Sequence, residues 1–163
     1  MTALSFRLLG GALLTAAGAL FGYERAAALK RRLILLRELD AGLGIMADEL
    51  TALRAPLPRI FETLRDRPFF SLLHAGFGAE PTEALWRRAA EALELNREEI
   101  EILSALAPVI GRYDAEQQAA ELALARGRLA ERTSAVEAEL NGRARSFAGL
   151  GAACGAILAV VLF

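Results

Sequence analysis

The sequence is poor in the side chains on which most active sites depend. Its 163 residues include one histidine and one cysteine, His74 and Cys154. A single cysteine excludes an internal disulfide, and a single histidine excludes a histidine-rich metal centre. The 19 basic and 20 acidic side chains leave a net charge of −1, which excludes a strongly basic nucleic-acid binder. These shortages remove most enzyme classes.

Catalytic motifs are missing as well. The sequence has no glycine-rich phosphate loop, no pair of carboxylates at catalytic spacing and no nucleophile beside a base. His74 lies in an apolar run without cysteine or histidine neighbours, so we interpret it as a structural side chain. Glu98, Glu99 and Glu101 lie where a helix start favours anions, so we interpret them as a solvated acidic face and not as a metal site. We therefore expect no enzyme activity, catalytic residue, metal or cofactor, and no nucleic-acid or small-molecule ligand.

Apart from Arg7, charged side chains are absent from both ends of the chain. No acidic residue precedes Glu24 or follows Glu139. The segment 8–23 has no ionisable side chain except a tyrosine, and the segment 147–163 has none except a cysteine. Much of the 55% apolar content therefore lies in two terminal stretches and not in a soluble core.

Each stretch is just long enough to cross a lipid bilayer. A helix of about 17 residues spans roughly 25 Å, and the hydrocarbon core is about 30 Å thick. Arg7 and Arg145 can extend their charged groups outward and lengthen the usable span. We therefore predict transmembrane helices at residues 4–23 and 146–163. Small residues four apart give each helix a flat packing face, and these are Gly18 and Gly22 in the first and Gly151 and Gly155 in the second.

The charges beside the spans set the expected orientation. Ala17-Gly18-Ala19 resembles the cleavage site of a signal peptide, which is the alternative interpretation of the first span. Basic residues follow that span, however, on the side that would be translocated. By the positive-inside rule, the charged middle of the chain is cytoplasmic and both termini lie outside. The basic residues that carry this inference are Arg25, Lys30, Arg31 and Arg32 after the first span and Arg143 and Arg145 before the second.

Two long amphipathic helices are predicted next to the spans. No proline occurs before Pro56, so a helix over 24–54 continues the first span, and a second over 115–145 leads into the last. Their apolar rows face each other if the helices pack antiparallel as a stalk. The rows are Leu29, Leu33, Leu36, Leu43, Ala47 and Leu50, with Leu39, Met46 and Leu53 beside them, and Ala115, Ala119, Leu122, Leu129, Val136 and Leu140. Polar residues interrupt both rows, namely Asp40 in the first and Arg126 and Thr133 in the second. We therefore expect further helices to cover the seam, which is the line of contact between the two long helices.

Those helices are expected in a head over residues 57–111. Asn96 and Glu99 have the spacing of a helix-capping box, Gly111 ends the next helix, and Asp114 is placed to cap the long final one. No strand pattern is present. The fold class is therefore all-α, a bundle of about six helices whose two-helix stalk continues into both transmembrane helices.

The order of these features resembles the stage III sporulation protein AB family over nearly the whole chain. Glu49 stands seven residues before Pro56-Leu57, and Trp86 lies in a helix of the head. The sharpest motif is Ile110-Gly111-x-x-Asp114-x-x-x-Gln118, which is similar to the LG-x-x-D-x-x-x-Q pattern of the family, with isoleucine in place of leucine. The resemblance makes Glu49, Pro56, Gly111, Asp114 and Gln118 the candidate binding residues.

The resemblance implies a role in endospore formation. Members of the family lie in the mother-cell membrane around the forespore, in the channel complex that joins the two cells. Their soluble domain is similar to the platform protein of type II secretion and type IV pilus machines, which pairs with a cytoplasmic ATPase. The implied partners are a secretion-type ATPase, other subunits of the complex, membrane lipid and a second copy of the chain. This step is an analogy at the level of the fold.

Two questions stay open at the level of the sequence. Gly111 and Asp114 could serve the fold alone, and Gln118 could bond Glu49, a neighbouring backbone group or a partner. The function could instead be that of a free-standing membrane scaffold or regulator that oligomerises without an ATPase. A small pore-forming protein is the weakest alternative, because neither span has a polar stripe.

Overall fold

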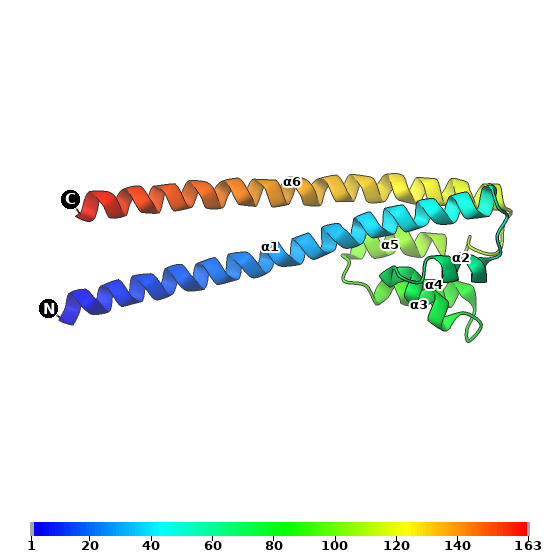
Figure 1. Ribbon diagram of the computed structural model, residues 1–163, viewed down its shortest axis with the longest axis horizontal. Coiled ribbons are helices and arrows are strands. Elements are labelled where there is room, and N and C mark those ends of the chain that lie inside the picture. Colours follow the sequence, from blue (N-terminus) through cyan, green and yellow to red (C-terminus); the bar gives the residue numbers. More distant parts are fainter. Residues whose placement is uncertain (1, 163) are drawn as a thin grey trace. The chain divides into compact units, whose positions relative to one another are not determined.

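The fold is all-α, as predicted. The computed structural model describes the backbone of residues 2–162 and the side chains of residues 23–142 (Figure 1). This part contains six helices and no strand, only a single β-bridge between Phe77 and Glu80. The helices are α1 (Thr2–Thr51), α2 (Leu57–Thr63), α3 (Pro68–Gly76), α4 (Thr82–Glu91), α5 (Arg97–Leu106) and α6 (Ala115–Leu162).

The predicted transmembrane segments coincide with the ends of the two longest helices. Both segments, 4–23 and 146–163, fall outside the described side chains except for Tyr23, as do Gly18, Gly22, Gly151 and Gly155. Among residues 23–142, none of the helices has a stretch long and apolar enough to cross a membrane.

The chain divides into two compact units. One combines residues 1–31 with 136–163, and the other comprises residues 32–135. The second unit, called the helical domain below, contains α2 to α5 and the parts of α1 and α6 that pack with them. All side-chain contacts that follow lie within this domain.

In the helical domain, α1 and α6 run antiparallel and their polar interruptions meet (Figure 1). The Nε of Arg126 lies 2.9 Å from Oδ1 of Asp40. The hydrogen bond to Asp40 raises the pKa of Arg126, although partial burial opposes it. The polar residues of the two rows thus satisfy each other. Most of the predicted apolar positions around them are buried, namely Leu33, Leu36, Leu39, Leu43, Met46 and Leu50 of α1 and Leu122 and Leu129 of α6.

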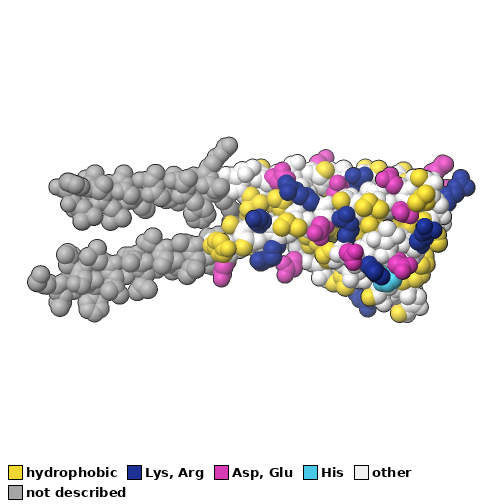
Figure 2. All heavy atoms as spheres, viewed as in Figure 1, with side chains coloured by type: hydrophobic (Ala, Val, Ile, Leu, Met, Phe, Trp, Pro, Cys, Tyr) yellow, Lys and Arg dark blue, Asp and Glu magenta, His cyan; other side chains and the backbone are white. Residues whose placement is uncertain are grey.

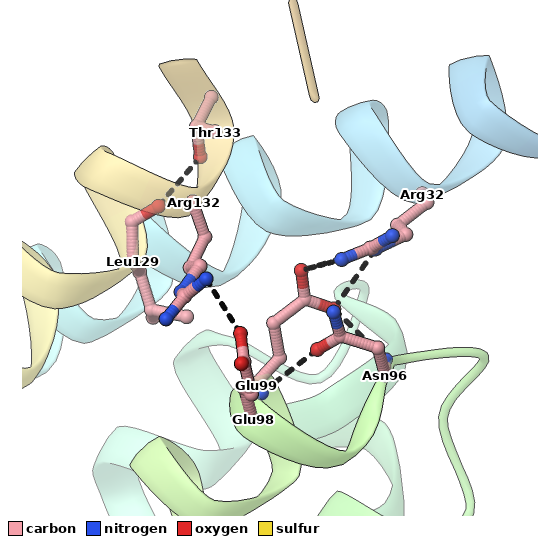
Figure 3. Close-up of polar contacts among 7 residues, drawn as sticks. All are labelled: Arg32, Asn96, Glu98, Glu99, Leu129, Arg132 and Thr133. Atoms are coloured by element: carbon pink, nitrogen blue, oxygen red, sulfur yellow. Dashed lines mark hydrogen bonds and ion pairs between the residues drawn. The ribbon is translucent and has the colours of Figure 1, made fainter. Parts of the chain in front are cut away.

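Ion pairs fix α5 across both long helices, which covers the seam as expected (Figure 3). Glu99 does not belong to a solvated face, because its carboxylate is fully buried and both its oxygens lie 3.0 Å from Nε of Arg32 on α1. It also accepts a hydrogen bond from the backbone N–H of Asn96, whose side chain accepts one from Glu99 N–H, so the capping box is confirmed. The neighbouring Glu98 pairs with Arg132 of α6 at the surface.

Aromatic side chains form the core of the head. Trp86 is fully buried, its Nε1 donates a 2.8 Å hydrogen bond to the carbonyl oxygen of Leu103, and its ring packs edge-on at 4.9 Å against Phe69. Burial of the indole therefore leaves no unpaired donor. The buried apolar residues of α2 are Ile60, Phe61 and, just after its end, Leu64.

Several details differ from the predictions. Helix α1 ends at Thr51 and not at residue 54, because the chain turns at Arg54, which has a positive φ of 47°. Leu53 is therefore 64% exposed and not part of the buried stripe. His74 is exposed on α3 and contributes nothing to the core.

Gly42 and Gly44 of α1 are sites of close packing. A Cβ on Gly42 would lie 2.3 Å from Cε2 of Phe70, and one on Gly44 would lie 3.0 Å from Cζ of Arg126. These glycines therefore let neighbouring side chains approach the backbone of α1.

Candidate functional site

The residues of the family motif form the turn between α5 and α6. Gly111 has a φ of +81°, a left-handed conformation that favours glycine. Three residues later, Oδ1 of Asp114 accepts a 2.8 Å hydrogen bond from the backbone N–H of Gln117, which caps the start of α6. Both residues thus have a clear part in reversing the chain.

Gln118 holds this turn closed. It is 6% exposed, its Oε1 accepts a 3.1 Å hydrogen bond from Gly111 N–H, and its Nε2 donates a 2.6 Å bond to the carbonyl oxygen of Tyr113. The sequence left open whether Gln118 bonds Glu49, a neighbouring backbone group or a partner. In the structure its hydrogen bonds go to neighbouring backbone groups and not to Glu49. One side chain therefore satisfies a backbone donor and a backbone acceptor of an irregular segment.

Replacing Gln118 by leucine is expected to destabilise the protein by about 2 kcal/mol, because both backbone groups lose their partner. Thermal unfolding of the full chain in detergent, followed by circular dichroism, measures the change. Gln117→Leu is the matched control, because Gln117 is exposed and only its backbone N–H takes part in the cap. Equal shifts of Tm for the two variants would show that the side chain of Gln118 does not hold the turn.

The start of α2 lies beside this turn. A Cβ on Gly111 would lie 3.1 Å from Cδ1 of Leu57, so the side chain of Leu57 packs against the motif. Pro56 itself is exposed, in an extended conformation that starts α2. Glu49, in the last turn of α1, has one buried carboxylate oxygen without a hydrogen-bond partner, while its backbone oxygen accepts a 3.1 Å bond from Ala55 N–H.

A groove of about 530 Å³ separates the last turn of α1 from the first turn of α6, and we call it the end groove. Its lining comes from both helices and the turn after α1, and consists of Leu50, Thr51, Arg54, Ala55, Asp114, Ala115 and Glu116. Of these residues, the sequence predicted only Asp114 as a candidate binding residue, while Leu50 and Ala115 were predicted only as members of the apolar rows. Arg54 has a left-handed backbone conformation after the end of α1, where glycine is the usual residue. An arginine in the sequence does not predict such a conformation.

The charges of the end groove do not neutralise one another. In the part of the chain that the structure describes, Arg54 and Glu116 form no ion pair, and Asp114 is engaged only as a helix cap. Elsewhere in the helical domain, charged side chains pair across helices, as Arg32 with Glu99 and Arg126 with Asp40 do. Among residues 23–142, no group of three or more histidine, cysteine, aspartate or glutamate side chains is placed to hold a metal ion.

Comparison with known families decides the class of the protein. The family described as "Stage III sporulation protein AB (spore_III_AB)" matches residues 7–163. The chain belongs to this family. The resemblance inferred from the motif is thereby confirmed, and the chain is a sporulation protein. A solved structure titled "Stage III sporulation protein AB (SpoIIIAB)" is similar with a TM-score of 0.61 and 20% sequence identity, over 68% of this chain and 97% of that one. This likeness shows the same helical fold. No curated protein matches the chain.

Proposed function

We propose that this chain is a non-catalytic platform subunit of the sporulation complex in the mother-cell membrane, where it docks a cytoplasmic secretion-type ATPase. The observation that carries the proposal is the family match over residues 7–163. Support for an ATPase partner comes from the analogy with secretion and pilus platforms, whose helical domains pair with such enzymes.

The contacts of three carboxylates support a non-catalytic role for this chain. Glu99 and Asp40 join helices through ion pairs with arginine, and Asp114 caps a helix. The surface seen in Figure 2 interleaves acidic and basic side chains with small apolar areas, which suits a polar protein interface.

In this proposal, residues 4–23 and 146–163 anchor the chain in lipid, with Gly18, Gly22, Gly151 and Gly155 at helix contacts. The helical domain is cytoplasmic, and both termini lie on the other side of the membrane. Such an arrangement follows from the apolar ends of the sequence and the basic residues beside them.

Co-purification tests the docking. The full chain, solubilised in mild detergent from sporulating cells, is expected to retain the secretion-type ATPase of the same complex. A chain with the two terminal segments but without residues 32–135 serves as the control and should retain none. Recovery of every other subunit of the complex without the ATPase would contradict the platform role.

Cysteine labelling tests the topology. Cys154 is replaced, and single cysteines are introduced as Thr2→Cys near the N-terminus and Ser71→Cys on the exposed surface of α3. An impermeant thiol reagent added to intact cells should label the first cysteine and not the second, and both after lysis. The reverse pattern would place the helical domain outside the cytoplasm and exclude direct contact with an ATPase there.

The second candidate is a membrane scaffold that oligomerises through the stalk without an ATPase. The exposed large apolar side chains on the long helices favour it, and these are Ile34 and Ile45 on α1 and Leu124 on α6. Replacing Leu124 by glutamate separates the two functions. A scaffold loses its oligomeric state in cross-linking experiments, whereas a platform keeps its ATPase.

A further inference from the structure

The end groove combines an apolar lining with charged residues that have no partner. Leu50, Ala55 and Ala115 supply apolar surface, while Arg54 lies on the α1 side and Glu116 on the α6 side. Three ion pairs join helices of this domain, whereas within the described residues Arg54 and Glu116 form none. An interface commonly has an apolar centre with complementary charges around it.

The backbone at Arg54 adds an independent observation. A left-handed conformation is unfavourable for a residue with a Cβ, and glycine avoids that cost. The arginine side chain is exposed and makes no hydrogen bond or ion pair within the described residues, so no internal contact compensates for the cost. Retained strain without an internal benefit is typical of functional positions.

The two sides of the groove have opposite charge. A ligand of one sign alone would meet repulsion on one side, because Arg54 is cationic and both Asp114 and Glu116 are anionic. A protein segment that carries an acidic and a basic side chain around an apolar one would satisfy both sides and cover the apolar lining. The volume of about 530 Å³ accommodates a few side chains and not a folded domain.

We propose that the end groove is the surface on which this subunit receives its ATPase, through a segment of the ATPase with an apolar residue between an acidic and a basic one. The acidic residue pairs with Arg54, and the basic residue pairs with Glu116 and the outer oxygen of Asp114. This inference rests on the proposed platform function and specifies its contact surface. The groove is built from the parts of α1 and α6 that are farthest in sequence from the predicted membrane spans.

The test measures binding and stability together, with the full chain in lipid nanodiscs and the purified ATPase of the same complex as the probe. Arg54→Gly removes the charge and relieves the backbone, so Tm should stay constant or rise while Kd increases about tenfold. Glu116→Gln should increase Kd about threefold. The matched controls are Arg65→Ala and Glu91→Gln, both exposed and away from the groove, and both should bind like the wild type.

Each outcome decides the inference. Weaker binding by both groove variants, with an unchanged or higher Tm for Arg54→Gly and unchanged controls, supports the groove as the contact surface. If the wild type binds and the groove variants bind equally well, the inference is wrong and the platform function stands. Equal weakening by the controls would show a general effect of surface charge and would also overturn it. A wild type that does not bind the ATPase contradicts the platform function and the inference with it.

Discussion

Replacing Glu99 by alanine is expected to destabilise the protein by about 3 kcal/mol, because it leaves a partly buried arginine without its counter-charge. The side chain of Glu99 is fully buried, and that of Arg32 is 23% exposed. The same substitution removes the acceptor for Asn96 N–H and so breaks the capping box of α5. The measurement is the shift of Tm of the full chain in detergent.

The neighbouring glutamate provides the control for this prediction. Glu98 also pairs with an arginine, Arg132, but its side chain is 57% exposed, and Glu98→Ala should cost less than about 1 kcal/mol. Removing both partners of the buried pair, as Arg32→Leu with Glu99→Leu, should be less harmful than Glu99→Ala alone, since no charge is left unpaired. Equal effects of Glu98→Ala and Glu99→Ala would show that burial does not strengthen the contact.

Replacing Gly42 by alanine is expected to destabilise the protein by about 2 kcal/mol, although alanine is the better helix former. The new Cβ would lie 2.3 Å from Cε2 of Phe70, whose ring is fully buried and packed against Phe69. The ring has no space to withdraw, so α1 and α3 would have to separate.

Gly127 on α6 gives the opposite result. A Cβ there would meet nothing within 4 Å, so Gly127→Ala should stabilise the protein by up to about 1 kcal/mol through helix propensity alone. The two substitutions are chemically identical, and their shifts of Tm should have opposite signs. A rise of Tm for both would mean that the helices are not in close contact at Gly42.

Local patterns in the sequence accounted for most of the fold. The apolar rows predicted the buried faces of α1 and α6, and the spacing of Asn96 and Glu99 predicted the start of α5. The polar interruptions Asp40 and Arg126 were visible in these rows. Their pairing could not be predicted, because it depends on the relative register of two helices and the two residues are 86 positions apart in the chain.

The end groove was much less accessible to prediction. The motif identified Asp114 and Gln118, and local spacing made a capping role for Asp114 plausible. The strained Arg54 was missed, because a helix expected to run to residue 54 contains no left-handed position. Glycine has a low helix propensity, but the close contact of Gly42 with Phe70 comes from tertiary packing that no local pattern encodes.

Recruitment of the ATPase to the membrane tests the central claim most directly. Membranes and cytosol from sporulating cells are separated, and the ATPase is quantified in each fraction with the chain present, deleted or carrying Arg54→Gly. The platform account predicts that the ATPase is found with the membranes only when the intact chain is present, and that Arg54→Gly moves much of it to the cytosol. An ATPase that stays with the membranes after deletion of the chain would contradict the account.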